Sequence, residues 1–244
     1  AGAKASIEIV HAGQYARVKD FAKGPSGFIR NDGVEVKEMT EEMMEETLRW
    51  YEQTAFDAKD IGFDMIFMHF GHGWLPAQFL SPFFNKRTDK YGGSLENRAR
   101  FPLMILERVR KAVGANFPID MRISATEWID GGIEFEDVLA FIKMAEPLID
   151  MVQISCGLDM EREANVHMVT TNFSEHVPNA KYAKIVKENV HIPVAVVGAI
   201  MNPDEAEQLI SDGVADMVAL GRALVADPEW PKKAREGRPE DIVP

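Results

Sequence analysis

Two histidines three residues apart are the side chains of this chain best suited to chemistry. His69 and His72 follow a short apolar run, residues 65–68, in a segment bounded by Gly62 and Gly71. The run is too short for a helix of its own, so we expect a buried strand that ends at the first histidine. Ligands of α/β folds bind at that edge, where imidazoles can hold and polarise a carbonyl or carboxylate oxygen. Taken alone, the pair is more often a packed core histidine and a loop histidine.

The histidines are not expected to bind a metal. Nothing indicates that their loop is helical, so the spacing of a helical zinc motif is missing, and Cys156 is a poor third ligand. Cys156 is also the single cysteine, which excludes a disulfide within the chain and fits a reducing cytoplasm.

Two further apolar runs end in glycine. Residues 193–197 lead into Gly198 and Ala199, and residues 216–220 lead into Gly221 and Arg222. Glycine lets backbone N–H groups approach an anion, and arginine donates paired hydrogen bonds to phosphate oxygens. The pattern therefore favours a phosphate site, while the alternative is that both glycines only serve tight turns.

Two charged residues lie within expected strands. Arg122 falls inside the run 119–124, where a buried charge is costly unless it is paired. It is expected to contact an anionic ligand or, equally, a nearby carboxylate. Glu8 lies in the run 6–10 and could accept a hydrogen bond from a ring N–H, or be an exposed carboxylate at a strand end.

Strands and helices that would position these residues alternate along the chain. The apolar runs predict six strands, most of them buried on both faces, at residues 6–10, 64–69, 119–124, 151–155, 194–197 and 216–220. Apolar spacing of three or four predicts helices around residues 44–61, 95–113, 135–144, 180–189 and 204–211. Such alternation indicates a single α/β domain with parallel strands. Six strands are two fewer than a (β/α)8 barrel needs, so the sheet is either open and doubly wound or a barrel whose first two βα units precede residue 1.

Composition narrows the partners. The chain has 244 residues, 46% hydrophobic and 27% charged, with a formal net charge of −12 and no basic stripe. These values are ordinary for a globular protein and do not favour nucleic acid or a membrane as partner. We interpret the charged loop at residues 85–94 as structural. The sequon at residues 172–174 is interpreted as chance, and the sequence leaves homo-oligomer formation open.

Several motifs resemble the old yellow enzyme family of FMN-dependent oxidoreductases. In order along the chain they are His11-Ala-Gly13, His69-x-x-His72-Gly, Gln78-Phe-Leu-Ser-Pro82, Asn85-x-Arg87-Thr-Asp89-x-Tyr91-Gly-Gly-Ser94-x-Glu-Asn-Arg98-x-Arg100-Phe and Gly221-Arg222-x-Leu-x-x-Asp227-Pro228. They keep the family's order over nearly the whole chain. The sequence is most similar to the branch of large iron–sulfur flavoenzymes that includes dienoyl-CoA reductase, bile-acid enoate reductases and trimethylamine dehydrogenase.

The resemblance implies one FMN-binding TIM-barrel domain over residues 1–244, a (β/α)8 barrel cut at both ends and lacking its first two βα units. It implies that the two histidines bind the oxygen that activates the substrate, and that Arg122 faces the flavin N1 side. It places Glu8 at the flavin pyrimidine edge. The implied phosphate site consists of Gly198, Ala199, Gly221 and Arg222.

The implied reaction is reduction of the C=C bond of an α,β-unsaturated carbonyl or carboxyl compound. Electrons come from NAD(P)H or from an attached electron-transfer domain through FMN. A 4Fe–4S centre and FAD are expected only in a longer parent protein and not on this chain.

One position departs from the family pattern. Many reductases carry a proton-donating tyrosine two residues after the second histidine, whereas this chain has Trp74, whose indole N–H is no practical acid. His167 is a candidate donor in its place. The departure leaves open a dehydrogenase of an amine or similar reduced substrate. A separate alternative is an inactive or non-catalytic fragment that binds no flavin.

Overall fold

A curved sheet of parallel strands organises the described residues, 2–169 and 175–243, of the computed structural model. Its six strands are hydrogen-bonded in chain order: β1 (Ser6–Ile9), β5 (Met65–Phe70), β6 (Ile119–Ser124), β7 (Met151–Ser155), β8 (Val194–Val197) and β9 (Met217–Ala219). All six predicted strands are confirmed to within two residues at their ends. In a doubly wound sheet the strand order reverses at a switch point, so this sequential order contradicts the open, doubly wound alternative. It is the order of successive strands in a (β/α)8 barrel.

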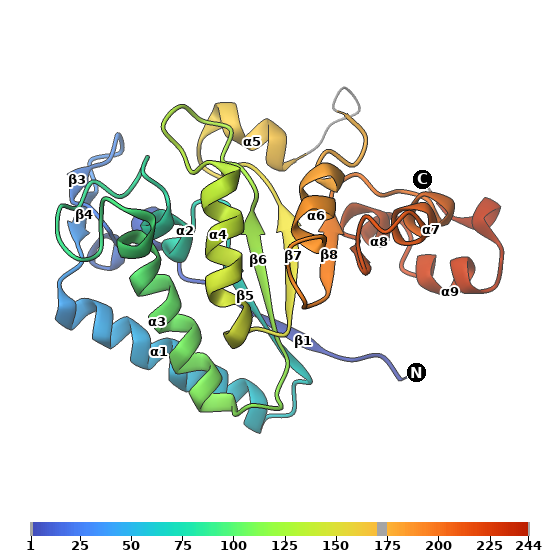
Figure 1. Cartoon of the computed structure of the whole chain (residues 1–244), viewed down its shortest axis with the longest axis horizontal. Coiled ribbons are helices and arrows are strands. Elements are labelled where there is room, and N and C mark those ends of the chain that lie inside the picture. Colours follow the sequence, from blue (N-terminus) through green and yellow to red (C-terminus); the bar gives the residue numbers. More distant parts are fainter. Residues whose placement is uncertain (1, 170–174, 244) are drawn as a thin grey trace.

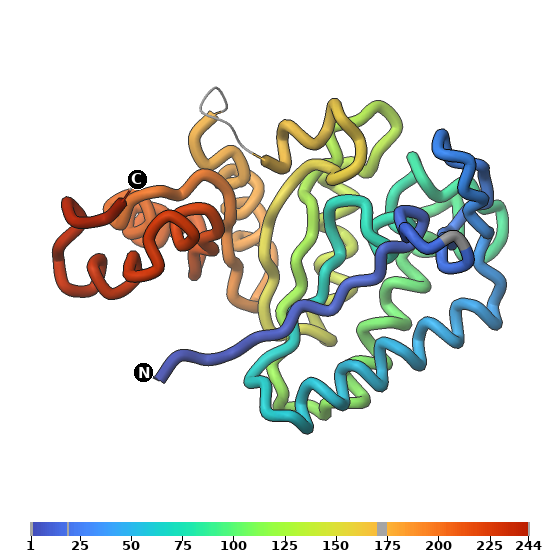
Figure 2. Tube along the Cα trace, turned by 180° about the vertical axis from the view of Figure 1, so that it is seen from behind, coloured from blue at the N-terminus to red at the C-terminus, as the bar shows by residue number. Residues whose placement is uncertain are grey.

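Helices cover one face of this sheet. The five long ones are α1 (Glu41–Asp60), α3 (Leu95–Val113), α4 (Phe135–Ala145), α6 (Ala180–Lys187) and α7 (Pro203–Ser211), as predicted. In Figure 1 α4 lies in front of the strands, while the view from behind in Figure 2 shows β5 to β7 with no helix in front of them. The sheet therefore has one packed face and one open, concave face.

Strand alternation separates the two faces chemically. On β5, Ile66, Met68 and Phe70 are fully buried towards the helices. The intervening residues point to the opposite, concave face because successive side chains of a strand alternate. The β5–β6 register pairs His69 with Arg122, so two of the predicted site residues lie side by side on that concave face.

Several short elements were not predicted. A three-stranded sheet of β2 (Lys23–Gly24), β4 (Glu35–Glu38) and β3 (Phe28–Ile29) lies between β1 and α1 in the chain. Short helices are α2 (Leu75–Leu80), α5 (Arg162–Met168), α8 (Arg222–Ala226) and α9 (Trp230–Arg235), and 3-10 turns lie at Gly13–Tyr15, Lys19–Phe21, Glu146–Leu148 and Pro239–Asp241. These elements carry neither the continuous apolar run of a buried strand nor enough turns to show the periodicity of a helix.

The charged loop at residues 85–94 is structural, as predicted. Asn85 Nδ2 donates to the carbonyls of Phe79 and Tyr91, both at 2.8 Å. Ser94 caps α3 by accepting a hydrogen bond from Asn97 N–H. These bonds lock the loop against α2 and the start of α3.

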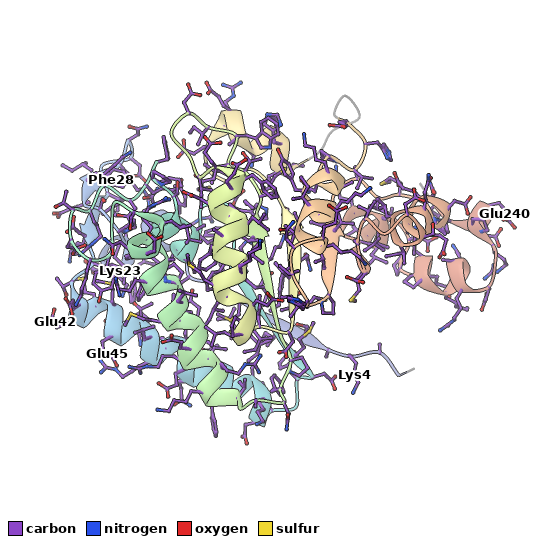
Figure 3. The ribbon with its side chains drawn as sticks, viewed as in Figure 1. Lys4, Lys23, Phe28, Glu42, Glu45 and Glu240 are labelled. Atoms are coloured by element: carbon purple, nitrogen blue, oxygen red, sulfur yellow. The ribbon has the colours of Figure 1, made fainter. Side chains whose placement is uncertain are left out.

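Acidic side chains on the helices account for much of the negative charge. Glu42 and Glu45 lie on the outer side of α1 (Figure 3), and Glu45 accepts hydrogen bonds from Arg108 of α3 at 2.9 Å. None of the described helices combines the length and the apolar character needed to cross a membrane. The sequon at residues 172–174 lies outside the described residues.

Candidate functional site

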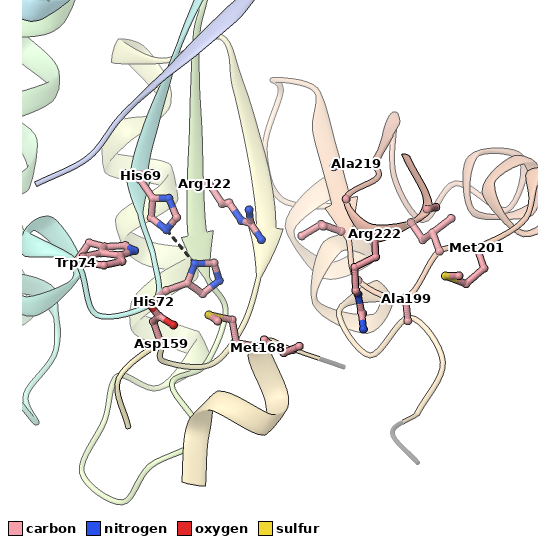
Figure 4. Close-up of a pocket in the computed structure, with 16 residues that line it drawn as sticks. His69, His72, Trp74, Arg122, Asp159, Met168, Ala199, Met201, Ala219 and Arg222 are labelled. Atoms are coloured by element: carbon pink, nitrogen blue, oxygen red, sulfur yellow. Dashed lines mark hydrogen bonds between the residues drawn. The ribbon is translucent and has the colours of Figure 1, made fainter. Parts of the chain in front are cut away.

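A cavity of about 420 Å³ opens at the carboxyl ends of the parallel strands. Its volume is typical of sites for small molecules and cofactors, which span roughly 300–1,000 Å³. Two walls face each other across it (Figure 4): a histidine wall of His69, His72, Trp74 and Arg122, and a glycine wall of Gly198, Ala199, Gly221 and Arg222. The fold thus gathers eight of the nine predicted site residues around one space.

The histidine wall is built from direct contacts between its side chains. His69 Nε2 lies 2.9 Å from His72 Nδ1, and His69 Nδ1 contacts the carboxylate of Glu8 on β1. The ring N–H contact expected of Glu8 is therefore made to His69. Glu8 does not line the cavity itself and reaches it through this imidazole.

Two strand-end serines support His72. Ser155 Oγ, at the end of β7, lies 2.8 Å from His72 Nε2, and Ser124 Oγ, at the end of β6, accepts a hydrogen bond from the backbone N–H of His72 at 3.0 Å. The serines are partners in the β6–β7 register, so both lie at the rim that carries the histidines. Sequence reasoning missed them, although small polar residues at the ends of adjacent predicted strands were a usable signal.

Arg122 makes no salt bridge with any described residue. Its Nη2 donates to Ser155 Oγ at 3.3 Å, and its Nε is buried without a hydrogen-bond partner in the described chain. The carboxylates of Glu8 and Asp120 influence it only through space. The paired carboxylate considered as an alternative for Arg122 is therefore absent from the described residues.

Burial sets the protonation of this wall. It is the main cause that holds the pKa of His72 well below its ordinary value, and the charges of Arg122 and His69 act in the same direction. The hydrogen bond from His69 lowers the pKa of Glu8, which keeps that carboxyl ionised. Burial raises the pKa of Asp120, on the same face of β6 as Arg122, to about 7.

The glycine wall depends on backbone shape. β8 ends at Val197, and Gly198 follows with a φ of +127°. A Cβ at Gly198 would lie 3.1 Å from Nδ2 of Asn179, which donates to the Val197 carbonyl at 2.6 Å. Gly221 precedes α8 and Arg222 begins it, and both are exposed. Backbone N–H groups and the side chain of Arg222 therefore line this side of the cavity.

Residues with strained backbone conformations lie near the same carboxyl edge of the sheet. Among the described residues, the non-glycine residues with positive φ are His72, Trp128, Val177 and Ala199. His72, Trp128 and Ala199 lie in the loops that follow β5, β6 and β8, and Val177 lies between α5 and α6. Such conformations cost roughly 1–3 kcal/mol each and concentrate at functional sites, which strengthens the assignment of the site to this edge.

Further lining residues come from the loops after the strands and were not predicted. They are Asp159, Met168, Val169, Val197, Ile200, Met201, Ala219 and Ala223. Most are apolar and carry no chemical signature in a sequence, so only the folded chain identifies them.

His167 does not belong to the site. It lies on α5 and not in a loop, is exposed, and stacks on Trp128 with the ring centroids 4.4 Å apart. Its backbone carbonyl accepts a hydrogen bond from Cys156 Sγ at 3.2 Å, and burial raises the pKa of that thiol to about 11. Trp74 does line the cavity, with its ring edge-on to His69.

No group of three or more histidine, cysteine, aspartate or glutamate side chains in the described chain is arranged to hold a metal ion.

Comparison with known proteins places the chain in a family. The model of the NADH:flavin oxidoreductase / NADH oxidase family matches residues 1–241. A protein named NADH oxidase from Thermoanaerobacter brockii is 39% identical over 251 residues, which cover 99% of this chain and 38% of that protein. The chain thus spans well under half the length of this curated relative.

Two solved structures are similar to this chain over nearly its whole length. A complex of 2-naphthoyl-CoA reductase with 2-naphthoyl-CoA is 33% identical with a TM-score of 0.91, over 99% of this chain and 39% of that one. Histamine dehydrogenase from Rhizobium sp. 4-9 is 32% identical with a TM-score of 0.88, over 99% of this chain and 36% of that one. The match to the family model and these relatives confirm what the motifs indicated: the chain belongs to the NADH:flavin oxidoreductase / NADH oxidase family.

Proposed function

We propose that this chain forms the FMN-binding barrel of an oxidoreductase that reduces the C=C bond of an α,β-unsaturated carbonyl or carboxyl compound with electrons from NADH or NADPH. The observation that carries the proposal is the single cavity that joins a histidine wall, suited to an oxygen atom, to a glycine and arginine wall, suited to a phosphate. Membership of the family supports FMN and an NADH-type electron donor.

The residues fit FMN on both walls. The buried Nε of Arg122 is a donor without an acceptor among the described residues, and the C2 carbonyl and N1 of a flavin are acceptors. Arg222 and the backbone at Gly198, Ala199 and Gly221 would hold the phosphate. When bound, FMN supplies the hydride chemistry.

The histidine pair would bind the substrate oxygen. Each of its four ring nitrogens lies within hydrogen-bond distance of Glu8, Ser155 or the other histidine. An entering oxygen must therefore exchange one of these bonds for its own. In Figure 4 the second nitrogen of His72 is turned away from His69, which makes the bond to Ser155 the most accessible one to exchange. N–H groups held in this way favour negative charge on the bound oxygen.

Trp74 favours a second candidate, oxidation of an amine or a similar reduced substrate. The indole beside His69 offers no proton for the α-carbon of a reduced alkene. The similar proteins carry names of both kinds, a 2-naphthoyl-CoA reductase and a histamine dehydrogenase.

The test is a titration of the purified chain with FMN, followed by anaerobic turnover. We expect quenching of flavin fluorescence, bleaching of the bound flavin by NADH or NADPH, and reoxidation by 2-cyclohexen-1-one. Bleaching by amines and no reoxidation by the enone would favour the dehydrogenase. If a large excess of FMN produced no quenching, the chain would act at most as a fragment without flavin.

A further inference from the structure

A continuous row of hydrogen-bonded groups crosses the sheet from β1 to β7. It runs from Glu8 through His69, His72 and Ser155 to Arg122. The Glu8 side chain is 43% exposed, whereas His69 and His72 are 7% and 4% exposed. The row therefore connects a half-exposed carboxylate on β1 to the buried wall of the cavity.

The chemistry of its two ends decides how the hydrogens point. A guanidinium only donates hydrogen bonds and a carboxylate only accepts them. With both imidazoles neutral, Arg122 donates to Ser155, and Ser155 to His72 Nε2. His72 Nδ1–H then donates to His69 Nε2, and His69 Nδ1–H to Glu8. Every hydrogen points towards Glu8.

The same row accommodates one extra proton without moving a heavy atom. If His72 Nε2 takes a proton from the cavity, the hydrogen on His72 Nδ1 can cross the 2.9 Å to His69 Nε2. His72 is then neutral again in its other tautomer, and His69 is the imidazolium. One proton enters on the cavity side, and one can leave His69 through Glu8.

The surrounding charges favour this location of the positive charge. Arg122 on β6 disfavours a charge on His72, as does burial, whereas Glu8 on β1 lies directly against His69. Asp120 on β6, Asp159 after β7 and Arg222 on α8 are the other charged groups that face this space. The outer histidine is thus the better place for the charge and the inner histidine the better place for exchange with a ligand.

Resting on the function proposed above, we propose that Glu8, His69 and His72 form a proton relay that leads from the cavity to the carboxylate of Glu8. It carries out the acid–base step for which Trp74 has no ionisable group. In reduction, His72 Nε2 gives a proton to the bound substrate and the pair is reloaded through Glu8. In oxidation, His72 Nε2 accepts the proton of the substrate N–H or O–H. Ser155 is a positioning residue that orients His72.

Other ionisable groups near the cavity are poorly suited to this step. His167 is exposed and stacks on Trp128 outside the cavity. Burial raises the pKa of the Cys156 thiol to about 11. The Tyr15 hydroxyl donates to Glu161 at 3.0 Å, and burial raises its pKa as well.

The test follows the histidine tautomers by NMR of the full chain, labelled with ¹⁵N-histidine and free of flavin, across a pH titration. We expect His72 to change from the Nδ1–H to the Nε2–H tautomer at the same pH at which His69 becomes charged. A tautomer of His72 that stays the same throughout the titration of His69 would overturn the relay. This measurement needs no variant and no turnover.

Variants then locate the charge. Glu8→Gln keeps an acceptor for His69 but removes the negative charge, and should lower the pH of the coupled transition by about one unit or more. Glu146→Gln is the matched control, because Glu146 lies 3.3 Å from Nδ1 of the exposed His191, far along the chain from the relay. It should leave the coupled transition in place, and an equal shift in both variants would contradict the proposal.

The outcomes separate the relay from the proposed function. Coupled tautomers in a chain that fails to bind FMN would retain the relay and reject the oxidoreductase for this chain. FMN binding together with uncoupled histidines would reject only the relay.

Discussion

The two walls of the cavity are organised in opposite ways. On the histidine wall, side chains hold one another: His69, His72 and Ser155 are buried, and each contacts a polar partner on a neighbouring strand. On the glycine wall, Gly221 and Arg222 are exposed, and the backbone at Gly198 and Ala199 takes the place of side-chain chemistry.

The difference indicates that the histidines serve the reaction and that the glycine wall serves attachment of the ligand. A wall of interlocked imidazoles is preorganised, so it can stabilise charge without rearranging when a substrate reacts. A wall of backbone N–H groups and one exposed arginine suits a ligand group that brings its own charge. Substitutions of His69 and His72 should therefore affect rate and proton balance, and those on the glycine wall should affect affinity for the phosphate.

The largest effect should follow from His72→Ala. Loss of the acid–base group and oxygen ligand should slow reoxidation of the reduced FMN-loaded protein by 2-cyclohexen-1-one by roughly 10²–10⁴-fold. Because His72 is assigned to the substrate oxygen and the phosphate to the glycine wall, FMN affinity should change by less than about threefold. Stopped-flow absorbance and a fluorescence titration measure the two quantities, with His191→Ala, a 96% exposed histidine, as control. Loss of FMN binding in parallel with rate would contradict the division between the walls.

The next largest effect should be on the pH dependence of the free energy of unfolding, and it should come from Asp120, which lies on the same face of β6 as Arg122. The pKa of Asp120 is raised by burial from 3.8 to about 7, so the folded protein holds a proton that the unfolded chain releases between these values. The native state therefore loses stability as pH rises through this window. In urea unfolding, the free energy of unfolding of Asp120→Asn relative to that of the wild type should increase by on the order of 2–4 kcal/mol between pH 4 and pH 8.

Asp64→Asn provides the control for that experiment. The hydrogen bond and charge of Lys4 lower the pKa of Asp64, so its contribution is present at neutral pH and disappears in acid. The two variants should deviate from the wild type with opposite signs above pH 5. If the free energies of unfolding of both variants changed with pH in the same way relative to the wild type, Asp120 would not be held in its protonated form.

Arg222→Ala tests the glycine wall. Charge-assisted hydrogen bonds are worth about 1.5–3 kcal/mol, so the dissociation constant for FMN should rise roughly 10- to 100-fold. Riboflavin, which lacks the phosphate, should bind the variant and the wild type equally. Arg235→Ala, an exposed arginine on α9, is the matched control for loss of one positive charge. An equal loss of riboflavin affinity would refute the phosphate assignment.

The smallest effect should follow from Trp74→Tyr. The new phenol adds a proton donor beside His69, but a working relay already supplies that proton, so enone reduction should increase by less than about tenfold. The rate of enone-dependent reoxidation measures it, compared with Trp74→Phe, which adds no donor. An increase of a hundredfold or more would mean that the histidine pair does not serve as the acid.

The sequence predicted the main framework because buried strands and amphipathic helices leave regular apolar patterns. The six strands of the parallel sheet and the five long helices of the described chain were found in this way. It could not show the small sheet between β1 and α1 or the short helix α5. That helix moves His167 away from the cavity that a loop would have let it reach.

Residue types also indicated most of the candidate site. Ligands bind at the carboxyl ends of parallel strands in such folds. Polar or flexible residues within or directly after the predicted strands therefore indicated a site: His69, His72, Arg122, Gly198 and Gly221. A lone serine at a strand end is ordinary, so Ser155 becomes a candidate only when it is considered together with Ser124 at the end of the adjacent predicted strand.

By itself, the sequence determined the kinds of groups available and the parallel fold that brings strand ends together. Only the tertiary structure decided which groups touch. The β1–β5 register sets Glu8 beside β5, where it reaches His69, and the β6–β7 register sets Ser155 beside β6, within reach of Arg122 and His72. Register depends on packing between segments that are distant in the chain, so no local pattern of residues reveals it.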